Sequence, residues 1–251
     1  MKIQKLSIVI PVYNEESTIQ LILDKVVQLS LLESIKKEIV VINDCSTDGT
    51  HQQILDFLAN YTKLNLIYFS QTINKGKGAA LHKGFELSSG DYIVIQDADL
   101  ELNPTDINNL LAAVEYGDAN IVYGSRFLEN KHQNVNFIWH ILGNSLLTRL
   151  SNLFTGLKLT DMMTCYKLFP KSILSKVDLK EQRFGFEPEI TIKLSKNKEL
   201  KIVEVPIFYS ARTKEEGKKI NYKDGIRVIY CILKYNLFNK IGGKSNKNKE
   251  K

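Results

Sequence analysis

Short apolar runs alternate along the first hundred residues with segments whose apolar residues recur at helical spacing. The runs predict strands, and the segments between them predict helices. The predicted strands are Leu6–Val12, Glu38–Asn43, Leu64–Ser70 and Tyr92–Gln96, and the predicted helices are Ser17–Leu31, Thr50–Asn60 and Lys77–Ser88. Strands that alternate with helices of this length form parallel βαβ units, so the sequence predicts an α/β fold with a mostly parallel sheet.

Polar clusters follow three of the predicted strands at the points where the strands end. They are residues 11–15, 43–50 and 97–99. Because the carboxyl ends of parallel strands share one edge of a sheet, we expect the clusters on one rim, where ligands of such sheets bind. Asp44 can accept two N–H bonds from the edge of a nucleobase, and Tyr13 can lie against the base.

The pair Asp97 and Asp99 is the most informative sign of chemistry. Two carboxylates two positions apart can reach one hard cation, and Mg²⁺ or Mn²⁺ prefers oxygen ligands and usually shares its shell with substrate phosphates. The pair therefore predicts a nucleotide diphosphate held through a metal. The alternative for this pair is a solvated loop after a strand. The alternative for the cluster at 43–50 is that Thr47 or Asp48 caps the helix that follows. The Gly- and Lys-rich turn at 74–80, which opens a predicted helix, suits a phosphate or a ribose.

Composition and charge narrow the class of protein. The hydrophobic content of 43% and the charged content of 25% are ordinary for a soluble globular protein. We expect neither a transmembrane helix nor a secretion signal, because the apolar runs are too short. The three cysteines indicate neither a metal site nor a disulfide framework, which fits a reducing cytoplasm.

The charge is distributed unevenly along the chain. Residues 1–130 hold 10 Lys and Arg against 17 Asp and Glu, a net charge of −7, whereas residues 131–251 hold 24 against 11, a net charge of +13. The basic half could meet phosphates, an anionic membrane surface or RNA. A solvated, lysine-rich surface is the alternative.

Five segments, in this order and spacing, resemble glycosyltransferase family 2: SIVIPVYNEESTI, VVINDCSTDGT, NKGKGAAL, GDYIVIQDADLE and VYGSRF. Within the family they are most similar to the dolichyl- or polyprenyl-phosphate mannose and glucose synthases. The resemblance covers about residues 6–210. It implies a GT-A (Rossmann-like) nucleotide-diphospho-sugar transferase fold with C-terminal amphipathic helices, an inverting hexosyl transfer, and a divalent cation, Mg²⁺ or Mn²⁺.

The resemblance also implies roles for individual residues. The nucleotide-sugar donor would be bound by Pro11, Tyr13, Glu15, Asp44, Lys77, Asp97, Ala98 and Asp99. The metal would be held by Asp97, Asp99 and Glu101. Glu101 replaces a Gln that relatives often have, and its alternative is a carboxylate that points to solvent. The reaction would be carried by Asp97, Asp99, Arg126 and Asp161. Arg126 would face the sugar-phosphate side, with a structural ion pair as its alternative role.

The basic half would supply the acceptor side. Two apolar stretches, 137–154 and 226–241, suit helices that lie in a membrane interface, as they do in the relatives; ordinary core helices are the alternative. The residues expected to bind the acceptor are Arg149, Arg212 and Lys219. A lipid phosphate is already anionic and needs only positioning, whereas a sugar hydroxyl needs a base, for which Asp161 ranks above Glu187.

We therefore predict a catalytic domain over residues 1–210, with a donor and metal half at 1–130 and an acceptor half at 131–210. An interfacial amphipathic segment at 211–241 and a disordered basic tail at 242–251 would follow. The predicted protein is a metal-dependent hexosyltransferase that moves a hexose from a donor of the GDP-mannose or UDP-glucose type to polyprenyl or dolichyl phosphate. We expect it in the cytoplasm, peripherally attached to an anionic membrane surface.

Two other functions stay open at this point. One is a family 2 enzyme that glycosylates a saccharide hydroxyl in surface polysaccharide or glycan synthesis. The other is a non-catalytic module that binds a membrane or a nucleic acid. Nucleic acid is not expected, because aromatic and basic residues do not interleave on a predicted strand. The sequence leaves the donor nucleoside, a membrane-protein partner and the oligomeric state undetermined.

Overall fold

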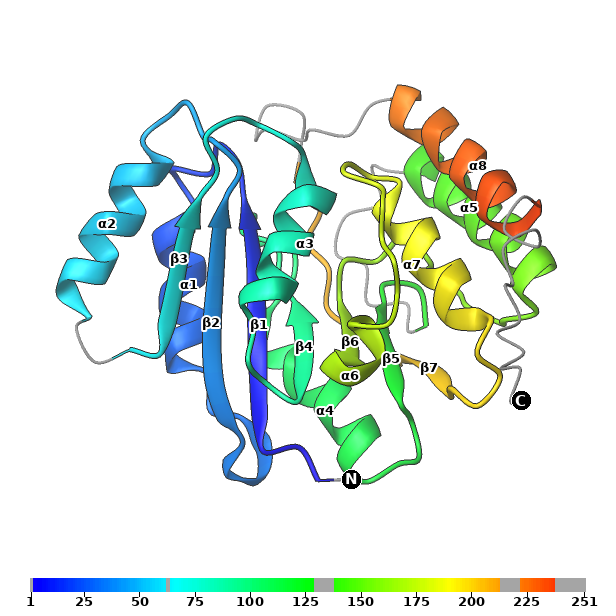
Figure 1. The fold of residues 1–251 in the computed structure, drawn as a ribbon, viewed down its shortest axis with the longest axis horizontal. Helices are drawn as coiled ribbons and strands as arrows, with labels where there is room; N and C mark the ends of the chain where they lie inside the picture. Colours follow the sequence, from blue (N-terminus) through cyan, green and yellow to red (C-terminus); the bar gives the residue numbers. More distant parts are fainter. Residues whose placement is uncertain (1, 62–63, 129–137, 213–221, 238–251) are drawn as a thin grey trace, which may run out of the picture.

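A seven-stranded sheet forms the centre of the molecule in the computed structural model, which describes residues 2–61, 64–128, 138–212 and 222–237 (Figure 1). The strand order is β3-β2-β1-β4-β6-β5-β7. The strands are β1 (Lys5–Val12), β2 (Lys36–Asn43), β3 (Leu66–Ser70), β4 (Tyr92–Ile95), β5 (Ile121–Ser125), β6 (Lys167–Pro170) and β7 (Ile202–Pro206). Neighbouring strands are parallel except for β6, which is antiparallel to β4 and β5. The mostly parallel α/β sheet expected from the sequence is confirmed.

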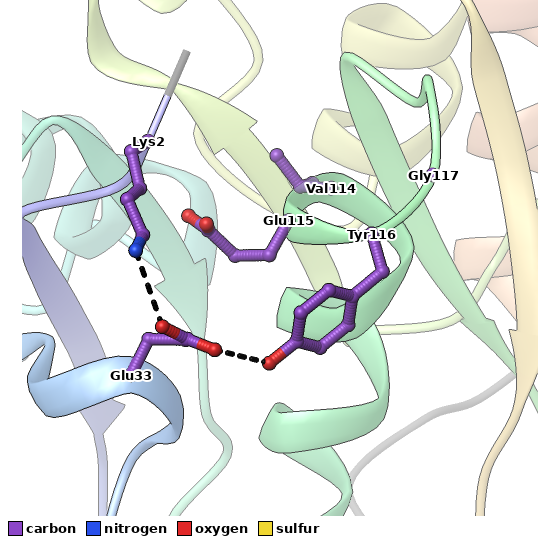
Figure 2. Close-up of a pocket in the computed structure, with 6 residues that line it drawn as sticks. All are labelled: Lys2, Glu33, Val114, Glu115, Tyr116 and Gly117. Atoms are coloured by element: carbon purple, nitrogen blue, oxygen red, sulfur yellow. Dashed lines mark hydrogen bonds and ion pairs between the residues drawn. The ribbon is translucent and has the colours of Figure 1, made fainter.

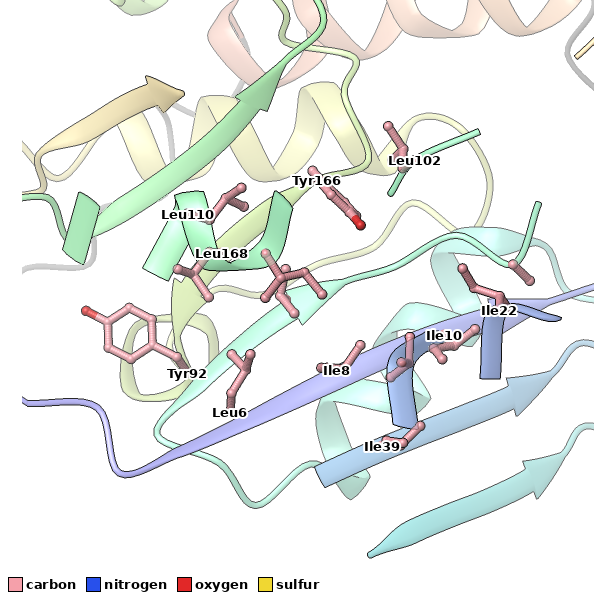
Figure 3. Packing of buried hydrophobic residues seen from close by; sticks show 14 of the residues in the cluster. Leu6, Ile8, Ile10, Ile22, Ile39, Tyr92, Leu102, Leu110, Tyr166 and Leu168 are labelled. Atoms are coloured by element: carbon pink, nitrogen blue, oxygen red, sulfur yellow. The ribbon is translucent and has the colours of Figure 1, made fainter. Parts of the chain in front are cut away.

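Helices cover both faces of this sheet. They are α1 (Ile19–Gln28), α2 (Thr50–Asn60), α3 (Lys77–Leu87), α4 (Ile107–Glu115), α5 (Ile138–Thr155), α6 (Lys171–Leu174), α7 (Phe186–Ser195) and α8 (Tyr222–Leu237), with short 3₁₀ turns η1 (Leu32–Ser34) and η2 (Pro104–Asp106). Side chains of a strand alternate between the faces. Leu6, Ile8 and Ile10 of β1 therefore pack with α1, α2 and α4, while Val9 packs with α3 and α7. Figure 3 shows the first of these faces, including Ile22 of α1.

The elements predicted for the first hundred residues are present, with shifts at their ends. β3 starts at Leu66, two residues later than predicted. α1 starts at Ile19 rather than Ser17, because the amides of Thr18 and Ile19 donate to the Glu15 carbonyl at 3.1 and 2.9 Å in a turn that precedes the helix. This turn keeps Glu15 at the rim of the sheet.

A buried carboxylate ties the sheet together at the amino ends of its strands. Glu38 of β2 accepts hydrogen bonds from Lys5 Nζ and Ser7 Oγ of β1, both at 2.6 Å. It also accepts bonds from the amide and hydroxyl of Ser89, at 2.7 and 2.6 Å. Burial raises the pKa of Glu38, but these bonds lower it by more, to about 2. Glu38 is therefore ionised at neutral pH and holds β1, β2 and the turn before β4.

Two long helices, α5 and α8, lie side by side on the outer side of α7 (Figure 1). A buried carboxylate seats α8: Glu181 accepts bonds from Arg227 Nη2 at 2.7 Å, Lys234 Nζ at 3.1 Å and Tyr235 Oη at 2.8 Å. The outward sides of the two helices expose large apolar residues, namely Leu142, Leu146, Leu153, Phe154, Ile226, Ile229, Tyr230, Leu233 and Leu237. Within the described residues, no helix is both long enough and apolar enough to cross a membrane.

Several predictions concern residues that the structure does not describe. Lys219 and the tail at 242–251 lie outside the described residues, as do most of 211–221. The predicted halves 1–130 and 131–210 contribute β1–β5 and β6–β7 to one sheet. The division into halves stays a prediction.

Candidate active site

The carboxyl ends of β1, β2 and β4 are neighbours, and each is followed by a residue in the left-handed region. Asn14 follows β1 with a φ of 50°, Cys45 follows β2 with 59°, and Leu100 follows β4 with 62°. This conformation turns the chain sharply, and it is costly for a bulky side chain such as that of Leu100. Because the three strands are adjacent and parallel, the polar clusters that follow them share one rim, as the sequence predicts. Pro11 and Tyr13 are half-buried there and Ala98 is buried.

Asp44 fixes the Gly- and Lys-rich turn that opens α3. Its carboxylate accepts the backbone amides of Lys75 at 2.8 Å and Gly76 at 2.7 Å, together with Gln71 Nε2 at 2.9 Å. Gly76 has a φ of 97°, which suits glycine. Three of the roughly four acceptor positions of the carboxylate are thus occupied. Asp44 therefore shapes the turn from inside the protein, and its predicted contact with a nucleobase stays a prediction.

Lys77, the first residue of α3, reaches across the rim to Asp97. Its Nζ lies 2.6 Å from Asp97 Oδ1 and 2.8 Å from the Cys165 sulfur. Burial lowers the pKa of Lys77, but Asp97, Cys165 and Glu187 together raise it by more, so the ammonium is stable. Burial likewise raises the pKa of Asp97, and Lys77, Cys165 and Arg126 together lower it by more. One carboxylate of the aspartate pair is therefore already neutralised by the protein.

Asp99 is in the opposite electrostatic situation. Burial and the nearby carboxylates of Asp97 and Glu101 raise its pKa to about 7. Crowded carboxylate oxygens of this kind fit a divalent cation, because the cation removes their repulsion. In the described part of the chain, no group of three or more His, Cys, Asp or Glu side chains is arranged to hold a metal. A cation bound at Asp99 would thus need further ligands from a substrate.

A segment that returns from β7 covers Glu101. We call residues 207–212 the strap. Glu101 accepts the Arg212 amide on its Oε1 at 2.9 Å and the Ser210 amide on its carbonyl at 2.9 Å. Leu102 and Tyr209 form an isolated antiparallel bridge, and the Tyr209 hydroxyl bonds to Glu101. In this state Glu101, a predicted metal ligand, is therefore hydrogen-bonded to the strap.

The guanidinium of Arg212, a residue predicted to bind the acceptor, lies beside Glu15 and Asp99, which are predicted to bind the donor. It donates to both carboxylate oxygens of Glu15, at 2.9 and 3.0 Å. Its Nη2 is also 3.4 Å from Asp99 Oδ2. Arg212 and Glu15 were predicted to bind different substrates, and the structure pairs them with each other.

Arg126 and Asp161 form a second ion pair beside the rim. Arg126 Nε and Nη2 donate to the two oxygens of Asp161 at 2.7 and 2.9 Å, and the Arg126 amide adds a third bond at 3.2 Å. Asn144 Nδ2 of α5 donates a fourth bond, at 2.8 Å. Burial raises the pKa of the fully buried Asp161, but Arg126 and Asn144 together lower it by more. The carboxylate oxygens of Asp161 are thus occupied by Arg126 and Asn144 in this state, and its role as a base stays a prediction.

Three further polar residues near this ion pair and on α5 differ in their burial and in their partners. Glu187, the second candidate base, forms a buried ion pair with Lys167 of β6. Glu204 of β7, which sequence reasoning missed, accepts the amides of Thr160 at 2.7 Å and Asp161 at 2.8 Å. The only feature of the sequence that could have indicated Glu204 is its position as a lone acidic residue inside the apolar run of β7. Arg149 is exposed on α5.

A cavity of about 420 Å³ lies near the amino end of β1, away from the rim (Figure 2). Lys2 and Tyr116 both contact Glu33, at 3.2 and 2.7 Å, and the Ile3 amide donates to Glu115 at 2.6 Å. These contacts satisfy the charged groups of the cavity with one another. None of the residues that line it is a predicted site residue.

Comparisons with known proteins agree with the motifs at the rim. The sequence model of Glycosyl transferase family 2 matches residues 7–178. A dolichol-phosphate mannosyltransferase of Pyrococcus furiosus is 29% identical over 236 residues, which are 92% of this chain and 64% of that protein. A dolichyl-phosphate beta-glucosyltransferase of Trichomonas vaginalis is 27% identical over 254 residues, covering 94% of this chain and 74% of that protein.

The fold is also found in solved structures. Glucosyl-3-phosphoglycerate synthase of Mycobacterium tuberculosis, in complex with Mn²⁺, uridine diphosphate and phosphoglyceric acid, superposes with a TM-score of 0.70 at 19% identity. The match covers 92% of this chain and 78% of that chain. At this identity the likeness shows the fold alone. The chain spans less than two thirds of the mannosyltransferase, so activity and substrates have to be argued from the site.

Proposed function

Because the chain belongs to glycosyl transferase family 2, we propose that it transfers a hexose from a nucleotide sugar to a polyprenyl or dolichyl phosphate, with inversion at the anomeric carbon. The donor would lie on the rim formed by β1, β2 and β4. The acceptor would approach from the side of Arg126 and α5. Relatives named for dolichol phosphate and dolichyl phosphate support a lipid phosphate as acceptor.

One observation carries the choice of acceptor: both carboxylates considered as a base are bound to cations. Asp161 is held by Arg126, and Glu187 is held by Lys167. A hydroxyl acceptor needs a carboxylate that can take its proton. A phosphate is already an anionic nucleophile, so it needs positive charge and correct placement. Arg126 and Arg212 can supply both, since the guanidinium fork matches phosphate oxygens.

We further propose that the donor binds with Mg²⁺ or Mn²⁺. Asp97 and Asp99 would hold the cation, with Glu101 once the strap has left it. The cation would neutralise charge on the leaving nucleoside diphosphate. The residues fit this role because these carboxylates lie close together, and burial together with their mutual repulsion raises the pKa of Asp99 to about 7. Solved structures of the same fold that contain Mn²⁺ or Mg²⁺ together with uridine diphosphate support it.

We also propose peripheral attachment to a membrane through α5 and α8. The two helices expose a row of leucines, isoleucines and a tyrosine next to Arg227 and Lys234. Amphipathic helices of this kind lie in the membrane interface. The attachment would bring the lipid phosphate to Asn144 and Arg126. The free cysteines in the described residues fit a cytoplasmic location.

The direct test is transfer with a panel of donors. The protein is incubated with radiolabelled GDP-mannose or UDP-glucose, Mg²⁺, and undecaprenyl or dolichyl phosphate, and the organic phase is extracted. We expect label in the organic phase with one of the donors, and none with the Asp97→Asn variant. Label that appears only on an added water-soluble saccharide would instead support the saccharide-acceptor enzyme. Absence of label in any product would argue against catalysis.

A further inference from the structure

Arg212 lies beside Asp99 and Glu101, two of the residues proposed to hold the metal ion. Its guanidinium is bidentate on Glu15, at 2.9 and 3.0 Å, and its Nη2 is 3.4 Å from Asp99. Its own amide is bound to Glu101 at 2.9 Å. One arginine therefore contacts three carboxylates, two of which are proposed metal ligands.

The charges of this cluster favour an exchange of cations. Glu15 and Asp99 face the guanidinium, whose single charge is spread over three nitrogens, while Glu101 binds only the backbone amide of the same residue. A divalent cation carries twice the charge in a smaller volume, so it neutralises the same oxygens more effectively. A metal and the guanidinium cannot both occupy the space next to Asp99 Oδ2. Binding of one therefore weakens binding of the other.

The bound state of Arg212 also contains a defect. Its Nε is buried, and among the residues that the structure describes it has no hydrogen-bond partner. An unsatisfied buried donor costs about 1–3 kcal/mol. The defect lowers the cost of releasing the side chain and its strap. Arg212 is therefore held by charge rather than by a complete set of hydrogen bonds.

We propose that Arg212 is the counter-cation of the Glu15, Asp99 and Glu101 cluster before the donor binds, and that the incoming metal displaces it together with the strap. The inference rests on the proposed metal-bound donor. The displaced guanidinium becomes available to the acceptor phosphate. The acceptor site is therefore completed only after the donor has bound, and substrates add in that order.

The test measures metal affinity rather than turnover. Mn²⁺ is titrated into the full chain, and free Mn²⁺ is followed by electron paramagnetic resonance, with and without UDP or GDP. We expect Arg212→Gln to bind Mn²⁺ at least about fivefold more tightly than the wild type, the scale of coupling between competing ligands. Arg212→Lys should fall between the two. Arg227→Gln is the matched control, since it also removes an arginine from a buried glutamate, and it should leave Mn²⁺ affinity unchanged.

A second measurement follows the strap itself. Hydrogen exchange of the Ser210 and Arg212 amides, both bound to Glu101, should become faster when Mn²⁺ is added to the wild type. Arg212→Gln should also transfer hexose more slowly although it binds Mn²⁺ more tightly. A merely structural defect would weaken metal binding and transfer together.

Two results would overturn the inference in different ways. Equal or weaker Mn²⁺ binding by Arg212→Gln, with metal still bound by the wild type, would refute the displacement alone and leave the proposed function intact. If neither the wild type nor any variant binds Mn²⁺, with or without nucleotide, the proposed metal dependence falls and the displacement falls with it. Thermal melting of each variant identifies any that fail to fold.

Discussion

Arg126 and Arg212 each form a bidentate ion pair with a buried carboxylate. The sequence identifies all four residues as candidates, but it does not predict which residue pairs with which. Arg126 and Asp161 are 35 positions apart, and Arg212 and Glu15 are 197 positions apart. Hydrophobic periodicity reports on neighbours along one element, so contacts at these separations leave no trace in it. This is why the sequence offers Asp161 as the base for a hydroxyl acceptor but does not show that it pairs with Arg126.

The pairing of Asp161 makes a prediction about relative rates. Asp161→Asn should cost less than about tenfold in transfer, because no proton has to be removed and the amide keeps the shape of the side chain. Arg126→Ala should cost at least about 10²-fold, because it strips positive charge from a phosphate site. Rates are measured with saturating donor. A positioning residue cannot matter more than the group it positions, so an Asp161 variant far slower than the Arg126 variant would point to a general base.

The aspartate pair makes a second prediction at the same scale. Asp97→Asn and Asp99→Asn should each lower transfer by at least about 10²-fold, because both keep the shape of the side chain and lose ligand charge. Asp97→Asn should also lower the melting temperature, because it leaves the ammonium of Lys77 without its carboxylate partner. Activity is compared with and without Mg²⁺. Full activity of both variants in the presence of a chelator would remove the metal assignment.

Single elements differ in how well the sequence predicts them. The strands β1, β2 and β4 are long or continuously apolar, so their positions follow from pattern alone. β6 has four residues and starts with Lys167, whose charge is buried against Glu187. A lysine at the start of a short run argues against a buried strand, and only the tertiary ion pair makes it one. The antiparallel insertion of β6 between β4 and β5 was therefore not predictable.

The buried Glu38 predicts how acid affects the sheet. Its pKa is about 2, below the ordinary 4.5, so its stabilisation is present in full above about pH 5 and is lost as the pH falls towards 2. Glu38→Gln should lower the free energy of unfolding by about 2–3 kcal/mol at pH 7, and less at pH 3. Urea unfolding at both values measures this. The exposed Glu86→Gln is the control, and an equal loss at both pH values would contradict the linkage.

At the scale of the whole molecule, the proposed chemistry and the proposed membrane contact lie close to each other. α5 contributes Asn144 to the Asp161 pair, and its exposed leucines lie on the same helix. The cavity of Figure 2 lies near the amino end of β1, and its charged groups pair with one another. The sequence indicates α5 and α8 as apolar stretches, but it cannot tell an interfacial helix from a core helix. In the folded structure the listed side chains of both helices are exposed and so lie outside the core, and their contact with a membrane stays a proposal.

The exposed leucines make a prediction about vesicle binding. The double change Leu146→Asn and Leu153→Asn should lower binding to anionic vesicles by at least about tenfold, because each leucine contributes on the order of 1.5 kcal/mol when it enters the apolar layer. The two side chains are 66% and 79% exposed, so the fold should tolerate the change. Leu21→Asn, 54% exposed on α1, is the matched control. Unchanged sedimentation with vesicles would exclude α5 as the contact.

The central claim is that the nucleophile is a phosphate. It is tested most directly by offering the enzyme two acceptors that differ only in that group, undecaprenyl phosphate and undecaprenol, with the same labelled donor in the same detergent. We predict transfer to the phosphate at a rate at least about 10²-fold higher than to the alcohol, because both candidate bases are bound to cations. Transfer to undecaprenol at a comparable rate would contradict the account.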